Sequence, residues 1–282
     1  MKRTIFLTPA VALLIWLSGC NNTNQKEEVS STSNVPAPLV ETPDFNSDSA
    51  YAFVQAQVDI GPRVPNTESH RRAASLFIDK FKSYGARVTE QDFTATTFDG
   101  VNADLKNIIA SFYPQSRRRI LLAAHWDTRP FADKDTVRQD EPIDGANDGA
   151  SGVGVLMEIG RILAENDPGV GVDIILFDGE DWGNDVQTQS PVPTPPGLDT
   201  WYCLGSQHWS KNPHAPNYSA YFGILLDMVG GKNATFFKEG YSMDAAPLIV
   251  DKVWKTAARL GYSAFFIPRE GGAIIDDHVF VN

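Results

Sequence analysis

Residues 172–183 read Val172-Asp173-Ile174-Ile175-Leu176-Phe177-Asp178-Gly179-Glu180-Asp181-Trp182-Gly183. The first half of this segment is a short apolar run, which is typical of a strand buried on both faces of a sheet. The run ends in carboxylates, and ligands of open α/β sheets bind outside the carboxyl ends of the strands. The segment therefore indicates an α/β fold with a metal and general-base site at this position, and the alternative is a solvated acidic turn.

Two other apolar segments also end on residues that can carry out chemistry. Residues 120–124 predict a buried strand that is followed by His125, and residues 221–226 predict one that is followed by Asp227. Histidine and carboxylate side chains are ligands of Zn²⁺. Core packing does not explain why three separate strands end in this way, so we expect the three ends to meet at one site.

A glycine-rich turn carries a further carboxylate. Residues 144–152 lead into a helix predicted over residues 153–165, and Asp148 lies just before this helix. Asp148 is therefore either a ligand or an ordinary N-cap. The adjacent Glu180 and Asp181 can divide two tasks, because one can bind the metal while the other acts as general acid and base.

The remaining pattern predicts the helices and strands of one domain, without an internal repeat. The helices cover residues 49–60, 67–84, 201–210 and 244–260, and the strands cover 87–93, 105–112 and 263–267. The sequence stops in a last apolar run, residues 279–282, which has the pattern of a strand.

The first 46 residues are predicted to lie outside the folded domain. A basic start and an apolar run form the layout of a cleaved secretory signal over residues 1–19, too short to span a membrane. Residues 20–46 are rich in small polar residues and proline, so we expect a flexible tether before the domain at 47–282. The ending Leu-Ser-Gly-Cys resembles a bacterial lipoprotein signal, which implies a protein exported and anchored to a bacterial membrane by lipid on Cys20. Alternatively, Cys20 is an ordinary residue of the signal.

Charge and cysteine content narrow the function classes. The formal net charge of −11 argues against nucleic acid as a partner and favours cationic substrates such as free peptide amines. With Cys20 lipidated, Cys203 is the one remaining thiol of the sequence, so no internal disulfide framework is expected.

Several ordered motifs resemble one family. The segments AAHWDT (123–128), GANDGASG (145–152), FDGEDWG (177–183), LLDMVGG (225–231) and IDDH (275–278) are similar to the zinc exopeptidase superfamily of aminopeptidases and glutaminyl cyclases. Two more, LGSQHW (204–209) and VGGKNATFFKEGYS (229–242), resemble its glutaminyl-peptide cyclotransferase branch in the bacterial lipoprotein form. The resemblance covers about residues 50–282 and implies a three-layer α/β/α sandwich with a mixed, mostly parallel central sheet.

The resemblance also implies roles for single residues. Asp148 and Asp181 would be zinc ligands, Glu180 the general acid and base, and Asp227 and Asp276 members of a hydrogen-bonded catalytic set. The implied reaction converts the N-terminal Gln of a peptide into pyroglutamate with release of ammonia, at a single zinc, in a protein expected to be a monomer.

Two alternatives stay open at this point. In a two-zinc aminopeptidase, His125 and Asp227 would bind a second metal, whereas in a one-zinc cyclase His125 would only contact the ligands. Residue types alone do not separate these two enzymes. The other alternative is an inactive lipoprotein that binds peptide N-termini without turning them over.

One departure from the family pattern concerns the third zinc ligand. The family supplies a His from a Trp-His-Thr-like loop after the Asp-Asp-His segment, and the sequence ends before such a loop. His278 belongs to the Asp-Asp-His motif itself and is a poor substitute. We expect a C-terminally truncated sequence whose third ligand lies beyond Asn282, and the alternative is an incomplete metal site.

Overall fold

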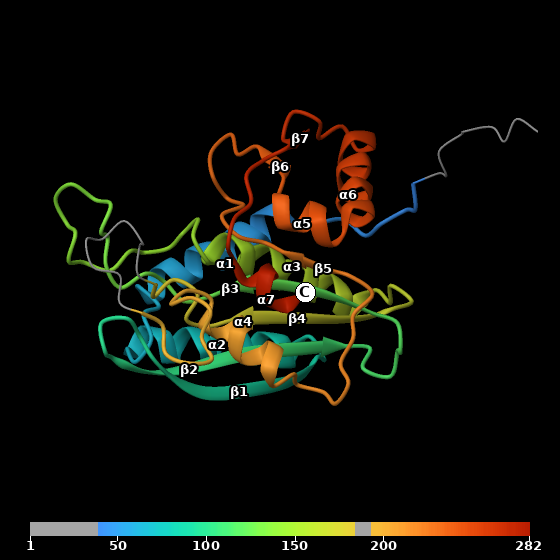
Figure 1. Ribbon diagram of the computed structural model, residues 1–282. Coiled ribbons are helices and arrows are strands. Elements are labelled where there is room, and N and C mark those ends of the chain that lie inside the picture. The colour runs from blue at the N-terminus through green and yellow to red at the C-terminus, as the bar shows by residue number, and fades with distance from the viewer. Residues whose placement is uncertain (1–38, 184–192) are drawn as a thin grey trace, which may run out of the picture. The chain divides into compact units, whose positions relative to one another are not determined.

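The computed structural model describes residues 39–183 and 193–282 (Figure 1). The chain forms two compact units, Met1–Thr42 and Pro43–Asn282, and the few described residues of the first contain no helix or strand. The expected signal, Cys20 and most of the tether lie outside the described residues. Among the helices that the structure describes, none has both the length and the apolar character needed to cross a membrane.

A five-stranded sheet forms the centre of the second unit. Its strands are β1 (Arg87–Thr96), β2 (Asn102–Phe112), β3 (Arg119–His125), β4 (Gly171–Phe177) and β5 (Gly223–Leu225), in the order β1-β2-β4-β3-β5. β2 pairs antiparallel with β1 and β4, whereas β3 pairs parallel with β4 and β5. In this sheet only β2 therefore runs against the other four strands, which confirms the mixed, mostly parallel sheet.

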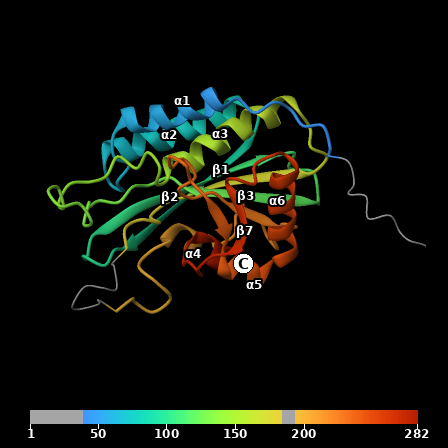
Figure 2. The ribbon, with the colours of Figure 1, turned by 90° about the horizontal axis from the view of Figure 1, so that it is seen from above.

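Helices cover both faces of this sheet (Figure 2). One face carries α1 (Ser47–Ile60), α2 (Glu68–Ser83) and α3 (Ala150–Glu165), and the other carries α4 (Leu204–Lys211) and α7 (Asp277–Val281). Phe77 of α2 and Leu156 of α3 pack with Ile174, while Trp209 of α4 packs with Ile175. All of β4 is buried because both of its faces are covered, as its continuous apolar run predicted.

A smaller sheet lies beside the central one. It contains β6 (Phe236–Lys238) and β7 (Phe266–Glu270), and it is accompanied by α5 (Gly240–Ala245) and α6 (Pro247–Arg259) (Figure 1). The single helix predicted over 244–260 is wrong, because Ala246 leaves the helical conformation and α6 begins at Pro247, which needs no N–H partner in a first turn. The three residues of β6 were not predicted, since so short a strand shows no clear periodicity.

The C-terminal run of apolar residues is a helix, so the predicted strand is wrong. The Asp276 side chain accepts a hydrogen bond from the backbone N–H of Asp277 and caps α7. Val281 then packs against the cluster that contains Ile109 and Trp209. A short apolar run fits a buried strand and a buried helix equally well, and here the cap and the packing select the helix.

Asp173, the polar residue of the apolar β4 run, is the centre of a buried hydrogen-bond network. Arg119 contacts both carboxylate oxygens, at 2.6 and 2.7 Å, while Ser111 and Tyr218 donate their hydroxyls at 2.6 and 2.9 Å. Burial alone would raise the pKa of Asp173, but the hydrogen bonds and the charge of Arg119 hold it below its usual range. The network fastens β2, β3 and β4 together at one end of the sheet.

Replacing Arg119 by Leu should lower the free energy of unfolding by about 3–5 kcal/mol, because it leaves the Asp173 carboxylate buried without its cation. Urea denaturation at neutral pH measures the change. The loss should shrink as the pH falls below about 4, since a group with a lowered folded pKa stabilises the fold only where it is ionised. As a control, Arg71→Leu breaks an exposed pair with Glu68 and should cost about 1 kcal/mol or less. Equal losses in both variants would contradict this account.

Candidate metal and catalytic site

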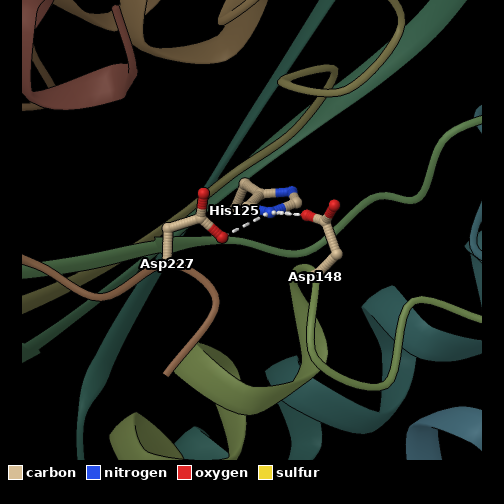
Figure 3. A group of neighbouring side chains, drawn as sticks. All are labelled: His125, Asp148 and Asp227. Atoms are coloured by element: carbon tan, nitrogen blue, oxygen red, sulfur yellow. Dashed lines mark hydrogen bonds and ion pairs between the residues drawn. The ribbon is translucent and has the colours of Figure 1, made fainter. Parts of the chain in front are cut away.

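The ends of β3 and β5 and the start of α3 bring three side chains together. His125 Nε2 lies 3.0 Å from Asp148 Oδ1 and 3.2 Å from Asp227 Oδ1, so the ring lies between two carboxylates (Figure 3). The His125 side chain is 1% exposed, whereas those of Asp148 and Asp227 are 31% and 25% exposed. Two of the three strand ends expected to meet, those of β3 and β5, therefore lie together, and the two carboxylates are open to solvent or to a ligand.

Electrostatics favour the charged form of His125. Burial alone would lower the pKa of its imidazole, but the surrounding carboxylates of Asp127, Asp148 and Asp227 raise that pKa well above its usual value. Without a metal ion, the positive imidazolium therefore compensates part of the negative charge of this cluster.

Asp148 does not cap α3. The N-cap position is Gly149, with a φ of 80° and no side-chain cap, and the Asp148 carboxylate instead faces His125. A side chain at residue 149 would need this left-handed conformation and would put its Cβ 2.9 Å from the Asp127 carbonyl oxygen. The glycine therefore lets the turn pass close to β3, and the alternative of an ordinary N-cap is wrong.

Arg63 holds the glycine-rich turn of residues 144–152 in place. The sequence pattern did not predict this role. Its guanidinium is fully buried and donates to the carbonyl oxygens of Trp126, Asp144 and Gly145 at 3.0, 2.8 and 2.8 Å. The signal in the sequence was a charged residue inside the turn Gly-Pro-Arg-Val-Pro, which no local pattern explains. Arg63 thereby ties the segment that carries Asp148 to the end of β3.

Asp127 fixes the turn that follows β4, and it too was missed as a site residue. Its fully buried carboxylate accepts hydrogen bonds from the backbone N–H groups of Glu180 and Asp181, at 3.0 and 3.1 Å. Burial would raise the pKa of Asp127, but the nearby His125 and the hydrogen bonds from these two amides lower it. In the sequence, the position of Asp127 two residues after His125, the end of a predicted strand, was the feature that could have pointed to this role.

The two adjacent carboxylates point to different partners. Glu180 Oε1 accepts a hydrogen bond from the Cys203 thiol at 3.4 Å, whereas Asp181 Oδ1 lies 3.5 Å from Arg129 Nη1. Asp178, in the same turn, is fully buried and accepts a hydrogen bond from His70 Nε2 at 2.8 Å. Asp178 and Asp181 are buried, Glu180 is half-buried, and each has a partner within the protein, so the alternative of a solvated acidic turn is wrong.

The donor atoms fit a divalent cation. Asp181 Oδ2 is buried and has no hydrogen-bond partner among the described residues. Burial and the nearby charge of Asp148 raise the pKa of Asp181 to about 8, so a cation bound here would favour its ionised form. Carboxylate oxygens and imidazole nitrogens suit zinc, so Asp148 and Asp181 remain the predicted ligands, with His125 beside them.

Glu180 and Asp276 form a second group with Cys203. Their ligand atoms lie within 4.8 Å of one another, as do those of His125, Asp148 and Asp227 in the first group. Burial, followed by the charge of Asp181, raises the pKa of Glu180 well above its usual value, and burial also raises that of Asp276. A carboxyl group with a raised pKa can carry a proton near neutral pH, which general acid catalysis requires.

His278 lies away from both groups. Its Nε2 is 3.0 Å from Glu239 Oε2, so the ring is already engaged. This geometry agrees with the view that His278 is a poor zinc ligand.

Replacing Asp127 by Asn should weaken zinc binding on the order of 10–10²-fold, because partners of metal ligands commonly contribute that much. The carboxamide offers one acceptor oxygen, so the amide of either Glu180 or Asp181 loses its partner. Titration against a chelating dye measures the affinity. Asp135→Asn is the matched control, since Asp135 accepts two backbone amides in an exposed loop, and its affinity should be unchanged. Unchanged affinity in Asp127→Asn would disprove the proposed role.

Solved structures resemble this chain over most of its length. A Zn-dependent exopeptidase from Parabacteroides distasonis is 51% identical with a TM-score of 0.81, covering 86% of this chain and 81% of that one. A glutaminyl cyclase from Bacteroides thetaiotaomicron bound to N-acetylhistamine is 48% identical with a TM-score of 0.82, covering 86% and 82%. A leucine aminopeptidase precursor from Bacteroides thetaiotaomicron is also 48% identical, with a TM-score of 0.82 and coverage of 86% and 83%.

Curated sequences add more distant relatives. Bovine glutaminyl-peptide cyclotransferase is 27% identical over 151 residues, which are 46% of this chain and 38% of the relative. The chain spans 33% to 40% of the length of the curated relatives it matches. The profile of Peptidase family M28 matches residues 107–282, which contain β3, β4, β5 and every residue of the two side-chain groups. This match covers well over half of the chain, and the chain therefore belongs to Peptidase family M28.

Proposed function

We propose that the protein is a zinc-dependent glutaminyl-peptide cyclotransferase. The amine of an N-terminal Gln attacks the carbonyl carbon of its own side-chain amide, so a C–N bond forms and closes the ring. The bond to the amide nitrogen breaks, and ammonia leaves. The observation that carries the proposal is the half-buried Glu180 carboxyl, which lies next to the predicted ligand Asp181 in the chain and has an oxygen within 4.8 Å of ligand atoms of Asp276 and Cys203. The similarity to bacterial glutaminyl cyclases supports it.

Asp148 and Asp181 would hold the zinc ion. When bound, zinc would supply a Lewis acid that polarises the side-chain carbonyl of the substrate. Arg63 and Asp127 hold the two segments that carry these ligands.

Glu180 moves the proton in this proposal. Its carboxylate takes a proton from the attacking amine and gives it to the departing nitrogen, which leaves as ammonia. Burial, the largest cause, raises the pKa of Glu180 well above its usual value, and a carboxylate with a raised pKa takes up a proton more readily, as a general base requires. No water molecule takes part as nucleophile, so a single metal ion suffices.

Asp227 and Asp276 complete the catalytic set. Carboxylate oxygens accept hydrogen bonds from an N–H group, and so they can hold the amine and the leaving nitrogen in place. Asp227 is itself held by His125 at 3.2 Å, and Asp276 lies beside Glu180. The acidic surroundings also favour a positively charged peptide amine.

A two-zinc aminopeptidase is the second candidate. The observation in its favour is that ligand atoms of His125, Asp148 and Asp227 lie within 4.8 Å of one another, as a second metal would require. His125 Nε2 lies 3.0 and 3.2 Å from the two carboxylates, which agrees with a place for His125 in either enzyme, so the substrate test below separates the two candidates. An inactive lipoprotein that binds peptide N-termini is the third candidate.

The proposal also includes the location of the protein. The Leu-Ser-Gly-Cys ending supports export and a lipid anchor on Cys20 that holds a monomeric enzyme at a bacterial membrane. Peptides and proteins with N-terminal Gln would be its substrates.

Incubating the zinc-loaded protein with a Gln-initiated peptide should release ammonia and lower the peptide mass by that of ammonia. A Leu-initiated peptide of otherwise identical sequence should stay intact. Mass spectrometry and a coupled ammonia assay measure both outcomes. Release of free leucine without ammonia would identify an aminopeptidase, and tight peptide binding without turnover would favour the inactive lipoprotein.

Glu180→Gln should lower kcat on the order of 10²–10⁴-fold, as expected for loss of a general acid and base, while zinc binding persists. Asp148→Asn should instead weaken zinc binding, because it removes a negatively charged ligand. Elemental analysis after dialysis, combined with steady-state kinetics, separates the two effects. Loss of zinc from Glu180→Gln would show that the division of tasks between Glu180 and Asp181 is wrong.

A further inference from the structure

Glu239 lies in a sequence motif that the proposed reaction does not use. It belongs to the segment VGGKNATFFKEGYS (229–242) and lies between β6 and α5. The segment 271–276, which carries Asp276 at its end, connects β7 to α7 (Figure 1). It contacts Glu239, whose carboxylate accepts a hydrogen bond from the backbone N–H of Ile274. The half-buried carboxylate of Glu239 therefore lies where these two segments meet.

The Glu239 carboxylate accepts four hydrogen bonds from two segments of the chain. Oε1 accepts from the backbone N–H groups of Tyr241 and Ile274, at 3.0 and 2.9 Å. Oε2 accepts from the backbone N–H of Ser242 at 2.7 Å and lies 3.0 Å from His278 Nε2. Ile274 and His278 stand two positions before and two positions after Asp276, so Glu239 holds the chain on both sides of that residue.

Backbone contacts support the same crossing. Gly271 N–H donates to the Lys238 carbonyl at 2.8 Å, and Gly240 N–H donates to the Gly272 carbonyl at 3.2 Å. A Cβ added at Gly240 would lie 2.9 Å from the Ala273 side chain, so the two segments are in close contact. A shift of Glu239 is therefore passed on to the segment that carries Asp276.

A carboxylate fits this place better than an amide. An ionised carboxylate has about four acceptor positions, and all of them are used here, whereas Gln has one acceptor oxygen and an NH₂ group that donates. Burial would raise the pKa of Glu239, but the amides of Ile274 and Ser242 lower it to about 2. Glu239 therefore stays ionised and accepts all four hydrogen bonds at any pH near neutral.

We propose that Glu239 is a positioning residue for catalysis, and that its carboxylate holds residues 274–278 so that the Asp276 carboxylate stays beside Glu180 and Cys203. This inference rests on the proposed function, since it assigns Asp276 to the catalytic set. Glu239 does not touch the reacting atoms or the predicted zinc ligands in this assignment. Its removal should therefore affect turnover more than substrate binding or metal content.

Glu239→Ala should lower kcat on the order of 10–10²-fold, because a displacement of about 1 Å of a catalytic group costs that much, while KM and zinc content stay close to those of the wild type. Glu239→Gln should recover part of the rate, since its carbonyl oxygen still accepts from the amides of Tyr241 and Ile274. Asp251→Asn is the matched control. It breaks the pair with Lys238 in the same small sheet and leaves residues 272–278 untouched, so kcat should not change.

Hydrogen–deuterium exchange gives a readout that is independent of activity. In Glu239→Ala, amides of residues 272–278 should exchange faster than in the wild type, whereas exchange in β3, β4 and α3 should be unchanged. If the wild type shows no cyclisation, the proposed function fails, and the exchange result alone still decides whether Glu239 holds this segment. Unchanged exchange, unchanged kcat in an active enzyme, or an equal loss of kcat in Asp251→Asn would each overturn the inference.

Discussion

The two backbone hydrogen bonds that Asp127 accepts are the interaction on which the site depends. They join the turn after β4 to the end of β3 and so fix the directions in which the side chains of Glu180 and Asp181 leave the chain. Burying this carboxylate is costly, and the two amides together with His125 offset that cost. Because the residues that bind metal and move protons occupy neighbouring positions, this constraint gives them separate surroundings.

Asp173 and Asp181 belong to the same sequence segment, but their hydrogen-bond partners give them different roles. Asp173 is saturated by Arg119, Ser111 and Tyr218, and its pKa lies below the usual range. Asp181 lies at the other end of the same segment, keeps one oxygen without a hydrogen bond among the described residues, and has a raised pKa. The first carboxylate is stable as it stands, whereas the second favours a cation, so the segment contributes both a structural anchor and a candidate ligand.

The small sheet of β6 and β7 also supports the site, from a second side of the fold. Glu239 contacts Ile274 and His278 and so holds the chain where it enters α7. Asp276, between these two residues, caps that helix and lies close to Glu180. The site is thus supported from the strand ends of the central sheet by Asp127 and Arg63, and from the smaller sheet by Glu239. Turns alone do not hold buried carboxylates so close together, because their mutual repulsion needs compensating donors.

Local pattern in the sequence was enough to identify the buried β4, the helices α1 to α3 and the strand ends that carry His125 and Asp227, because periodicity and chain breaks depend on neighbouring residues. The resemblance added roles for Asp148, Glu180, Asp181 and Asp276. The tertiary structure alone decided which hydrogen-bond partners Asp127, Arg63, Cys203 and Glu239 meet, because most of these partners lie far away in the sequence and become neighbours only when the chain folds. It also decided that the last apolar run is a helix, since packing against α4 and the cap by Asp276, rather than hydrophobicity, select that conformation.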